Sequence, residues 1–225
     1  MNINIVNKCS ICDEILNGDQ AGLYYLYAKS FLNNVESRIL YENEKFIVMP
    51  SLGPVAECHL LVLPKKHICS YAVWDQESLC EAEELIRKIS DIVRKRYGSS
   101  IVFEHGTLGE DMQGSASCVH AHMHIVSCSK SLYPYFKKDK LELRKIGRLS
   151  ELIDQKQRRC PYFFYQENEA TAYVMDDMIQ KSQYIRFLIA DILEKPDCGD
   201  WKKNPGILEV NKMILEMKKD FQNLF

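Results

Sequence analysis

Residues 118–126 read Cys-Val-His-Ala-His-Met-His-Ile-Val, so three histidines alternate with apolar residues. Successive side chains of a β-strand point to opposite faces, which predicts that His120, His122 and His124 share one face. Along that face the imidazoles would lie about 7 Å apart, and each would need its own buried partner if it were only a core residue. The pattern therefore favours a functional cluster over three separate core histidines.

Short apolar segments around this motif predict an antiparallel sheet. The expected strands are a hairpin over residues 38–49 and single strands at 59–63, 100–104 and 118–127. A helix is expected between the strands at 59–63 and 100–104, with Asp75 as its N-cap and Gly98 at its C-terminal end. The fold class predicted for residues 1–130 is thus α+β, with an antiparallel sheet of about five strands and packed helices.

Residues 131–225 are expected to form an extension that packs on this first domain. Residues 163–174 read as a hairpin that turns at 167–169. Apolar stripes predict two helices, over residues 185–193 and 208–221. The predicted extension is therefore a hairpin followed by two helices.

The composition describes an ordinary globular chain of 225 residues, 46% hydrophobic and 27% charged. A net charge of -2 argues against nucleic acid as a partner, and no apolar run reaches the roughly 18 residues of a membrane span. Residues 1–8 are too polar for a signal peptide, and nine cysteines is an odd number. We therefore expect reduced thiols and a cytoplasmic location.

Two stretches carry a resemblance to a known family. Residues 118–126 are similar to the histidine triad that defines the histidine-triad (HIT) family, and residues 53–67, which end in His-Leu-Leu-Val-Leu-Pro-Lys-Lys-His, resemble its second signature. The resemblance covers about residues 9–127, and the C-terminal third departs from the compact members. It implies a HIT-like fold and an enzyme, a nucleotide hydrolase or nucleotidyltransferase. Its partner would be a small nucleotide conjugate, and the compact members, usually dimers, leave a homodimer open.

The resemblance also implies catalytic roles. His122 would attack the α-phosphorus and form a covalent nucleotidyl-histidine intermediate, which fits the nucleophilicity of a neutral imidazole near pH 7. His124 would contact the phosphate oxygens, His59 would orient the cluster, and Ser117 matches a serine near the phosphate. Which acceptor then takes the nucleotide, and hence hydrolysis or transfer, stays open.

Other residues are candidates for substrate contacts. Glu104 stands where many family members have an asparagine at the phosphate. Lys181, Gln183 and Arg186 lie at the start of an expected helix, where donors can meet an anion. His105 is left between a role in the site and a place on the surface.

A metal site is expected at the N-terminus. Cys9 and Cys12 form a Cys-x-x-Cys pair, which by itself needs two more ligands. In family members with such a pair, the resemblance supplies a histidine after the lysine-rich turn and the first triad histidine, here His67 and His120. The four would form a closed Cys2His2 site for structural zinc, against the alternative of four unrelated residues.

Two other functions stay open. All three triad histidines could hold one catalytic metal, although no carboxylate lies beside them in the sequence to support it. The chain could also be a non-catalytic nucleotide-binding protein, although binding alone does not need a nucleophile. Residues 137–159 carry nine Lys/Arg against four Asp/Glu and form either a solvated surface or a contact for distal phosphates.

Overall fold

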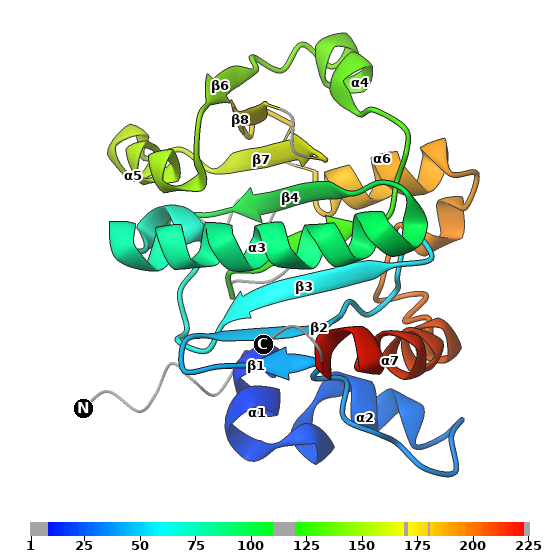
Figure 1. Cartoon of the computed structure of the whole chain (residues 1–225). Helices are drawn as coiled ribbons and strands as arrows, with labels where there is room; N and C mark the ends of the chain where they lie inside the picture. Colours follow the sequence, from blue (N-terminus) through cyan, green and yellow to red (C-terminus); the bar gives the residue numbers. More distant parts are fainter. Residues whose placement is uncertain (1–8, 110–119, 169–170, 180, 223–225) are drawn as a thin grey trace.

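The structure is a computed structural model that describes residues 9–109, 120–168, 171–179 and 181–222. Its strands are β1 (Tyr41–Glu42), β2 (Phe46–Pro50), β3 (His59–Pro64), β4 (Ile101–Gly106), β5 (Met123–Val126), β6 (Arg144–Ile146), β7 (Tyr162–Glu167) and β8 (Ala172–Asp176). Its α-helices are α1 (Ser10–Asn17), α2 (Leu23–Ala28), α3 (Gln76–Tyr97), α4 (Tyr133–Lys138), α5 (Ile153–Arg158), α6 (Tyr184–Ile192) and α7 (Ile207–Gln222). The result is a mixed fold built on one sheet (Figure 1).

The sheet has eight strands in the order β1-β2-β3-β5-β4-β7-β8-β6, and each neighbouring pair is antiparallel. Strands β1 to β5 are the ones predicted for the sheet. Strands β6, β7 and β8 belong to the same sheet, so the expected number of about five is wrong. The C-terminal hairpin does not stop at packing on the sheet but extends it, since β7 pairs with β4 from Ile101↔Glu167 to Gly106↔Tyr162. This pairing satisfies the backbone groups that the edge of β4 would otherwise leave open.

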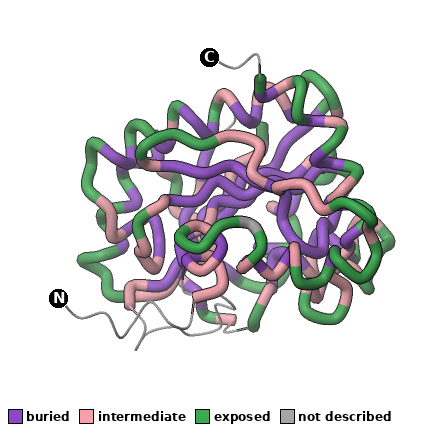
Figure 2. Tube along the Cα trace, turned by 90° about the horizontal axis from the view of Figure 1, so that it is seen from below, coloured by how far each residue is buried: buried purple, intermediate pink, exposed green. Residues whose placement is uncertain are grey.

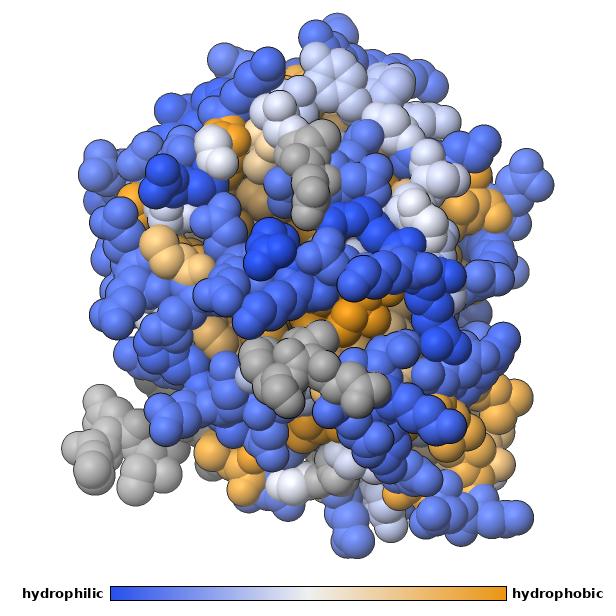
Figure 3. Space-filling model, in the orientation of Figure 1, coloured by the Kyte–Doolittle hydropathy of each residue, from blue (hydrophilic) through white to orange (hydrophobic). Residues whose placement is uncertain are grey.

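One face of the sheet is covered by α3, which begins and ends as predicted. The Asp75 carboxylate accepts from the backbone N–H of Ser78, and Gly98 ends the helix with a φ of 84°. A buried stripe of α3 packs against the apolar side chains of β3 and β5. The outer, polar side of the helix forms a blue band across the middle of this face in Figure 3.

The opposite face is covered in two places. Ile11 and Ile15 of α1 pack on alternate residues of β2 and β3, whereas α4 and α6 cover β4, β7 and β8. Figure 2 shows buried segments of the chain running through the middle of the molecule, with exposed segments around the outside. The predicted C-terminal hairpin (β7 and β8) and the two predicted helices (α6 and α7) are confirmed. The part of this face between α1 and α6 holds the candidate site.

The described part of the triad segment begins at His120, and β5 itself begins at Met123. Met123 and Ile125 pack into the core beneath α3, while His124 points to the opposite face and stacks on Phe103. The predicted alternation therefore holds along the strand, which is shorter than expected over the described residues. Among those residues no helix is both long and apolar enough to cross a membrane.

Candidate active site and metal centre

The triad histidines divide between two neighbouring sites. His120 faces the thiols of α1, and its Nδ1 lies 3.4 Å from the Cys12 Sγ and 3.6 Å from the Cys9 Sγ. His122 and His124 line a pocket between α1 and α6. The alternation by itself predicted one face for all three and did not distinguish His120, which the thiols of Cys9 and Cys12 contact.

Four side chains come together at the candidate metal centre. The Sγ of Cys12 lies 3.1 Å from the Nδ1 of His67, and one ligand atom from each of Cys9, Cys12, His67 and His120 falls within 4.8 Å of the others. The edges of a tetrahedron of sulfur and nitrogen ligands around zinc are about 3.3–3.8 Å long. The separations that involve His120 fall within that range, and the His67 separation lies just below it, so the cluster could hold a metal ion of this size.

One hydrogen bond and one pKa shift also fit a metal site. The Nε2–H of His120 donates to the Pro64 carbonyl at 2.8 Å, which leaves the Nδ1 lone pair toward the thiols. Burial, and then the neighbouring Cys9, raise the pKa of the Cys12 thiol to about 12. A thiolate would therefore form here only with a cation beside it, as a metal ligand requires.

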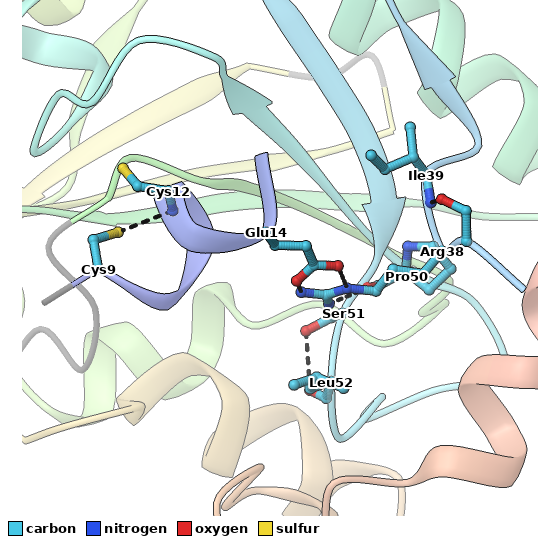
Figure 4. A network of polar contacts seen from close by, with 9 residues as sticks. Cys9, Cys12, Glu14, Arg38, Ile39, Pro50, Ser51 and Leu52 are labelled. Carbon is cyan, nitrogen blue, oxygen red and sulfur yellow. Dashed lines mark hydrogen bonds and ion pairs between the residues drawn. The ribbon is translucent and has the colours of Figure 1, made fainter. Parts of the chain in front are cut away.

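The helix that carries the cysteines is also tied to the sheet. Arg38 donates through Nε and Nη2 to the two carboxylate oxygens of Glu14, both at 2.7 Å, and through Nη1 to the Pro50 carbonyl at 3.0 Å (Figure 4). Arg38 and Glu14 are both buried, and Arg38 also lines the pocket. The pair was not predicted from the sequence, because Glu14 and Arg38 are 24 positions apart and no local pattern indicates their contact.

The pocket next to this helix has the size of a small-molecule site. Its empty volume is about 840 Å³, part of it open to solvent. The polar side chains that line it are Ser10, Arg38, Ser51, His105, His122, His124, Gln183 and Arg186. Apolar and aromatic side chains, among them Phe103 and Trp201, make up much of the rest. No carboxylate lines the pocket among the described residues, so its charged groups are suited to an anion.

Hydrogen bonds assign the tautomers of His122, His124 and the neighbouring His59. The Nδ1–H of His122 donates to the His120 carbonyl at 2.6 Å, so its Nε2 carries a lone pair. The backbone N–H of Val55 donates to the Nδ1 of His59 at 3.3 Å, so the proton of His59 lies on Nε2. That Nε2–H donates to the Nδ1 of His124 at 2.8 Å, which makes the Nε2–H of His124 a donor. Two adjacent imidazoles thus present an acceptor and a donor.

These histidines are also held neutral. Burial lowers the pKa of His122 to about 4, and burial followed by neighbouring positive groups lowers the pKa values of His59 and His124 well below the usual 6.5. One of those groups is Arg186, which is itself buried. At neutral pH His122 and His124 therefore face the pocket as uncharged imidazoles beside the guanidinium of Arg186.

Arg186 reaches from α6 to the loop between β2 and β3. Its Nη2 donates to the carbonyls of Gly53 at 2.5 Å and Leu52 at 3.4 Å, its Nη1 to the Ser51 Oγ at 3.3 Å, and its Nε to the Gly199 carbonyl at 3.3 Å. The same loop supplies the Val55 N–H that starts the hydrogen-bond chain. Arg186, predicted as a substrate contact, therefore also holds the loop that orients His59 and His124.

Of the other two predicted substrate residues on this segment, Gln183 lines the pocket and Lys181 does not. Gln183 lines the pocket, where its side chain donates to Asp200 at 3.2 Å. Lys181 is exposed, lies over the ring of Phe187 and does not line the pocket. Ser117 lies outside the described residues.

Glu104 is on the wrong face for the predicted role. Its carboxylate is buried and accepts from the backbone N–H of Tyr71 at 3.0 Å and from the hydroxyl of Tyr162 at 2.5 Å, on the α3 side of the sheet. The predicted substrate contact is therefore corrected: the strand alternation directs Phe103 and His105, not Glu104, toward the pocket. His105, left open from the sequence, belongs to the site.

The basic segment over residues 137–159 lines no part of this pocket among the described residues. Arg144 donates to Asp176 at 2.8 Å and to Gln155 at 2.9 Å, and Arg158 donates to Asp176 at 2.8 Å. These contacts favour the interpretation of the segment as a paired, solvated surface.

Comparisons with known proteins agree with the triad. The profile of the family described as "Scavenger mRNA decapping enzyme C-term binding" matches residues 26–136. An uncharacterized HIT-like protein of Chlamydia muridarum is 32% identical over 97 residues, which are 41% of this chain and 71% of that protein. A second, from Chlamydia trachomatis, is 30% identical over 95 residues, 41% of this chain and 81% of that protein. The chain belongs to the HIT-like, or histidine-triad, family.

Solved structures are more distant. A HIT family hydrolase from Clostridium thermocellum covers 55% of this chain and 92% of its own, with 23% identity and a TM-score of 0.35. A zinc-bound histidine-triad protein from Mycobacterium smegmatis covers 68% of this chain and 94% of its own, with 17% identity and a TM-score of 0.39. Neither carries an argument at these scores.

Proposed function

We propose that this chain is a nucleotide hydrolase or nucleotidyltransferase that attacks the α-phosphorus of a nucleotide conjugate through His122. The observation that carries the proposal is the pair of opposite tautomers at His122 and His124. A lone pair on the His122 Nε2 is a nucleophile, and the Nε2–H beside it on His124 is a donor for a phosphate oxygen.

The hydrogen bonds fit the two halves of such a reaction. When the His122 Nε2 bonds to phosphorus, the ring becomes positive, and its Nδ1–H already donates to the His120 carbonyl, which stabilises that charge. The donor on His124 is oriented in advance by His59 and the Val55 N–H, so it needs no rearrangement as charge develops on the phosphate. Water or another acceptor then takes the nucleotide from His122.

The pocket supports a nucleotide as the ligand class. Arg186, which donates to uncharged groups, offers positive charge to phosphates, and Trp201 and Phe103 offer apolar ring surface. The family description names a decapping enzyme, which agrees with a phosphate-linked nucleotide as substrate. Gln183 and Arg186 are the predicted substrate residues that this interpretation retains, and Ser117 stays a prediction.

We further propose that the Cys9, Cys12, His67 and His120 cluster holds zinc in a structural role. Two sulfur and two nitrogen ligands at near-tetrahedral separations fit zinc, and four protein ligands leave no open position for chemistry. The ion would anchor α1, one wall of the pocket, to the triad segment. A catalytic metal held by all three triad histidines has less support, because the Nδ1 of His120 is turned toward the thiols, away from His122 and His124.

The proposal is tested by trapping the intermediate on the full zinc-loaded chain. The protein is mixed with one nucleotide conjugate from each class, a dinucleoside polyphosphate, a nucleoside phosphoramidate, an adenylylated small molecule and a sugar nucleotide, and quenched in base. A phosphoramidate adduct is stable in base, so we expect a nucleotide mass on the peptide that contains His122. Release of a nucleoside monophosphate with no adduct under any quench would contradict the covalent route and favour activated water.

A further inference from the structure

His105 and Asp177 form a buried pair at the edge of the pocket. The Nε2 of His105 lies 2.9 Å from the Oδ2 of Asp177, and the side chains are 13% and 0% exposed. His105 lines the pocket together with His122 and His124. Asp177 follows β8 and reaches His105 past the start of β7, where its backbone N–H donates to the Pro161 carbonyl. A residue after position 130 thus contributes to the site.

The strand register puts His105 close to the proposed nucleophile. In the β4–β5 ladder Phe103 is paired with His124. Because these strands are antiparallel, two residues forward from Phe103 lead to His105 and two residues back from His124 lead to His122, just before the start of β5. Both side chains line the same pocket. His105 therefore faces the same space as the imidazole that would attack phosphorus.

This pair is poorly explained as a structural tie. A buried carboxylate loses its hydration, and an apolar pair of the same volume would usually hold the strands as well or better. The His105 ring also packs on Phe163, with centroids 4.4 Å apart, so its plane is held from a second side. An imidazole oriented by a carboxylate next to a nucleophile is the arrangement of a proton-transfer group.

We propose that His105, oriented by Asp177, is a second catalytic residue that protonates the leaving group. This inference rests on the proposed function. As the His122 Nε2 bonds to phosphorus, the bond from phosphorus to the leaving atom breaks. The leaving atom keeps the electron pair and takes the proton from the Nδ1 of the His105 imidazolium. In the second half, water bonds to phosphorus, returns a proton to His105, and the P–N bond electrons return to His122.

The proton donor defines a substrate class. A leaving group that is already a stable anion, such as a phosphate or a nitrophenolate, gains little from protonation. A leaving amine or alkoxide is strongly basic and gains much, typically about 10²–10⁴-fold in rate. The pair therefore fits nucleotides joined through phosphorus to an amine or an alcohol.

The test compares two adenosine 5′-monophosphate derivatives on the full zinc-loaded chain, an alkylamine phosphoramidate and a p-nitrophenyl ester. His105→Gln can still donate to Asp177 but cannot transfer a proton. We expect its kcat/KM to fall about 100-fold or more on the phosphoramidate and less than about 5-fold on the ester.

Two further variants keep the test decisive. Asp177→Asn preserves the shape of the pair and should show the same leaving-group dependence. It replaces His105→Gln in the test if that variant does not fold. Phe163→Leu disturbs the packing of His105 without touching a proton and should change both substrates by similar factors. Equal losses on both substrates in the two pair variants, or none, would overturn the role of His105 while the His122 adduct still stands. Absence of that adduct in the wild type would instead overturn the proposed function and this inference with it.

Discussion

His120 and His122 are separated by one residue, yet the structure gives them different chemistry. His120 donates its Nε2–H to a carbonyl and turns Nδ1 toward two thiols, whereas His122 donates its Nδ1–H to a carbonyl and keeps a lone pair on Nε2 in the pocket. The ring is the same in both places. What differs is which nitrogen a backbone carbonyl occupies, and hence which nitrogen is left for a metal or for phosphorus.

The comparison separates two kinds of residue in one motif. The metal end would hold α1 in place when zinc is bound, and the pocket end carries the proposed chemistry. Replacing a residue at one end should therefore change stability and metal content, and replacing a residue at the other end should change turnover alone.

The largest expected effect is at the pocket end. His122→Asn should fold, retain its metal and bind nucleotide, but lose at least about three orders of magnitude in kcat, roughly 4 kcal/mol of barrier. The reason is that asparagine can donate to the His120 carbonyl but cannot form the bond to phosphorus. Turnover of the trapped substrate is measured beside zinc content, and near-normal turnover would remove the covalent step.

The second prediction concerns the metal end. Cys12→Ser should remove zinc and lower the free energy of unfolding by about 3 kcal/mol, because a structural metal contributes directly to folding. For a chain of this length the melting temperature should fall by about 6–12 °C. Cys80→Ser, at an exposed cysteine outside the cluster, is the matched control. Elemental analysis and thermal melts decide, and a zinc-free chain of unchanged stability would argue against the site.

A third, smaller effect should link α6 to the pocket end. Arg186→Gln removes the donors that hold the loop of residues 51–53, so the Val55 N–H should orient His59 less well. We expect kcat to fall about 30-fold, roughly 2 kcal/mol, with zinc content unchanged. Nitrogen NMR of the histidine rings should report a mixture of tautomers at His124. Arg87→Gln, on the exposed side of α3, is the control, and an equal loss there would point to a general effect of lost charge.

The smallest effect concerns Glu104, which belongs to neither end. Burial raises its pKa to about 7, so between its unfolded value of 4.5 and 7 the folded chain binds a proton that the unfolded chain releases. Stability from this group is therefore present at low pH and lost as pH rises. Glu104→Gln stays neutral, so from pH 6 to pH 8 the wild type should lose about 1 kcal/mol relative to the variant.

Denaturant titrations at the two pH values measure this difference. Glu84→Gln, at an exposed position on α3, should show no such dependence. Turnover and zinc content should be unchanged in Glu104→Gln, and a large loss of turnover would return Glu104 to the substrate site.

Much of the fold could be predicted from local patterns. The helix from Asp75 to Gly98 carries its own cap signals, and the hairpin over residues 163–174 carries its own turn. The length of the sheet could not be predicted, because the pairing of β7 with β4 joins segments about 60 residues apart and leaves no periodic trace in either one. The face of the sheet on which Glu104 lies was also predicted wrongly, because matching a residue to a position in the family does not show which way its side chain points.

The sequence by itself determined the chemistry that is available. It supplies three imidazoles at alternate positions, which a strand places on one face, and two thiols at metal-ligand spacing. The alternation alone does not divide the three imidazoles, the resemblance assigns His120 to the metal set, and the tertiary structure supplies the contacts that distinguish it from His122 and His124. The thiols of Cys9 and Cys12 lie against His120, whereas His122 lines the pocket. The chain after residue 130 adds Arg186 to that pocket and places Asp177 on His105. The physical reason is that a histidine's role depends on which partner each ring nitrogen meets, and those partners come from distant parts of the chain.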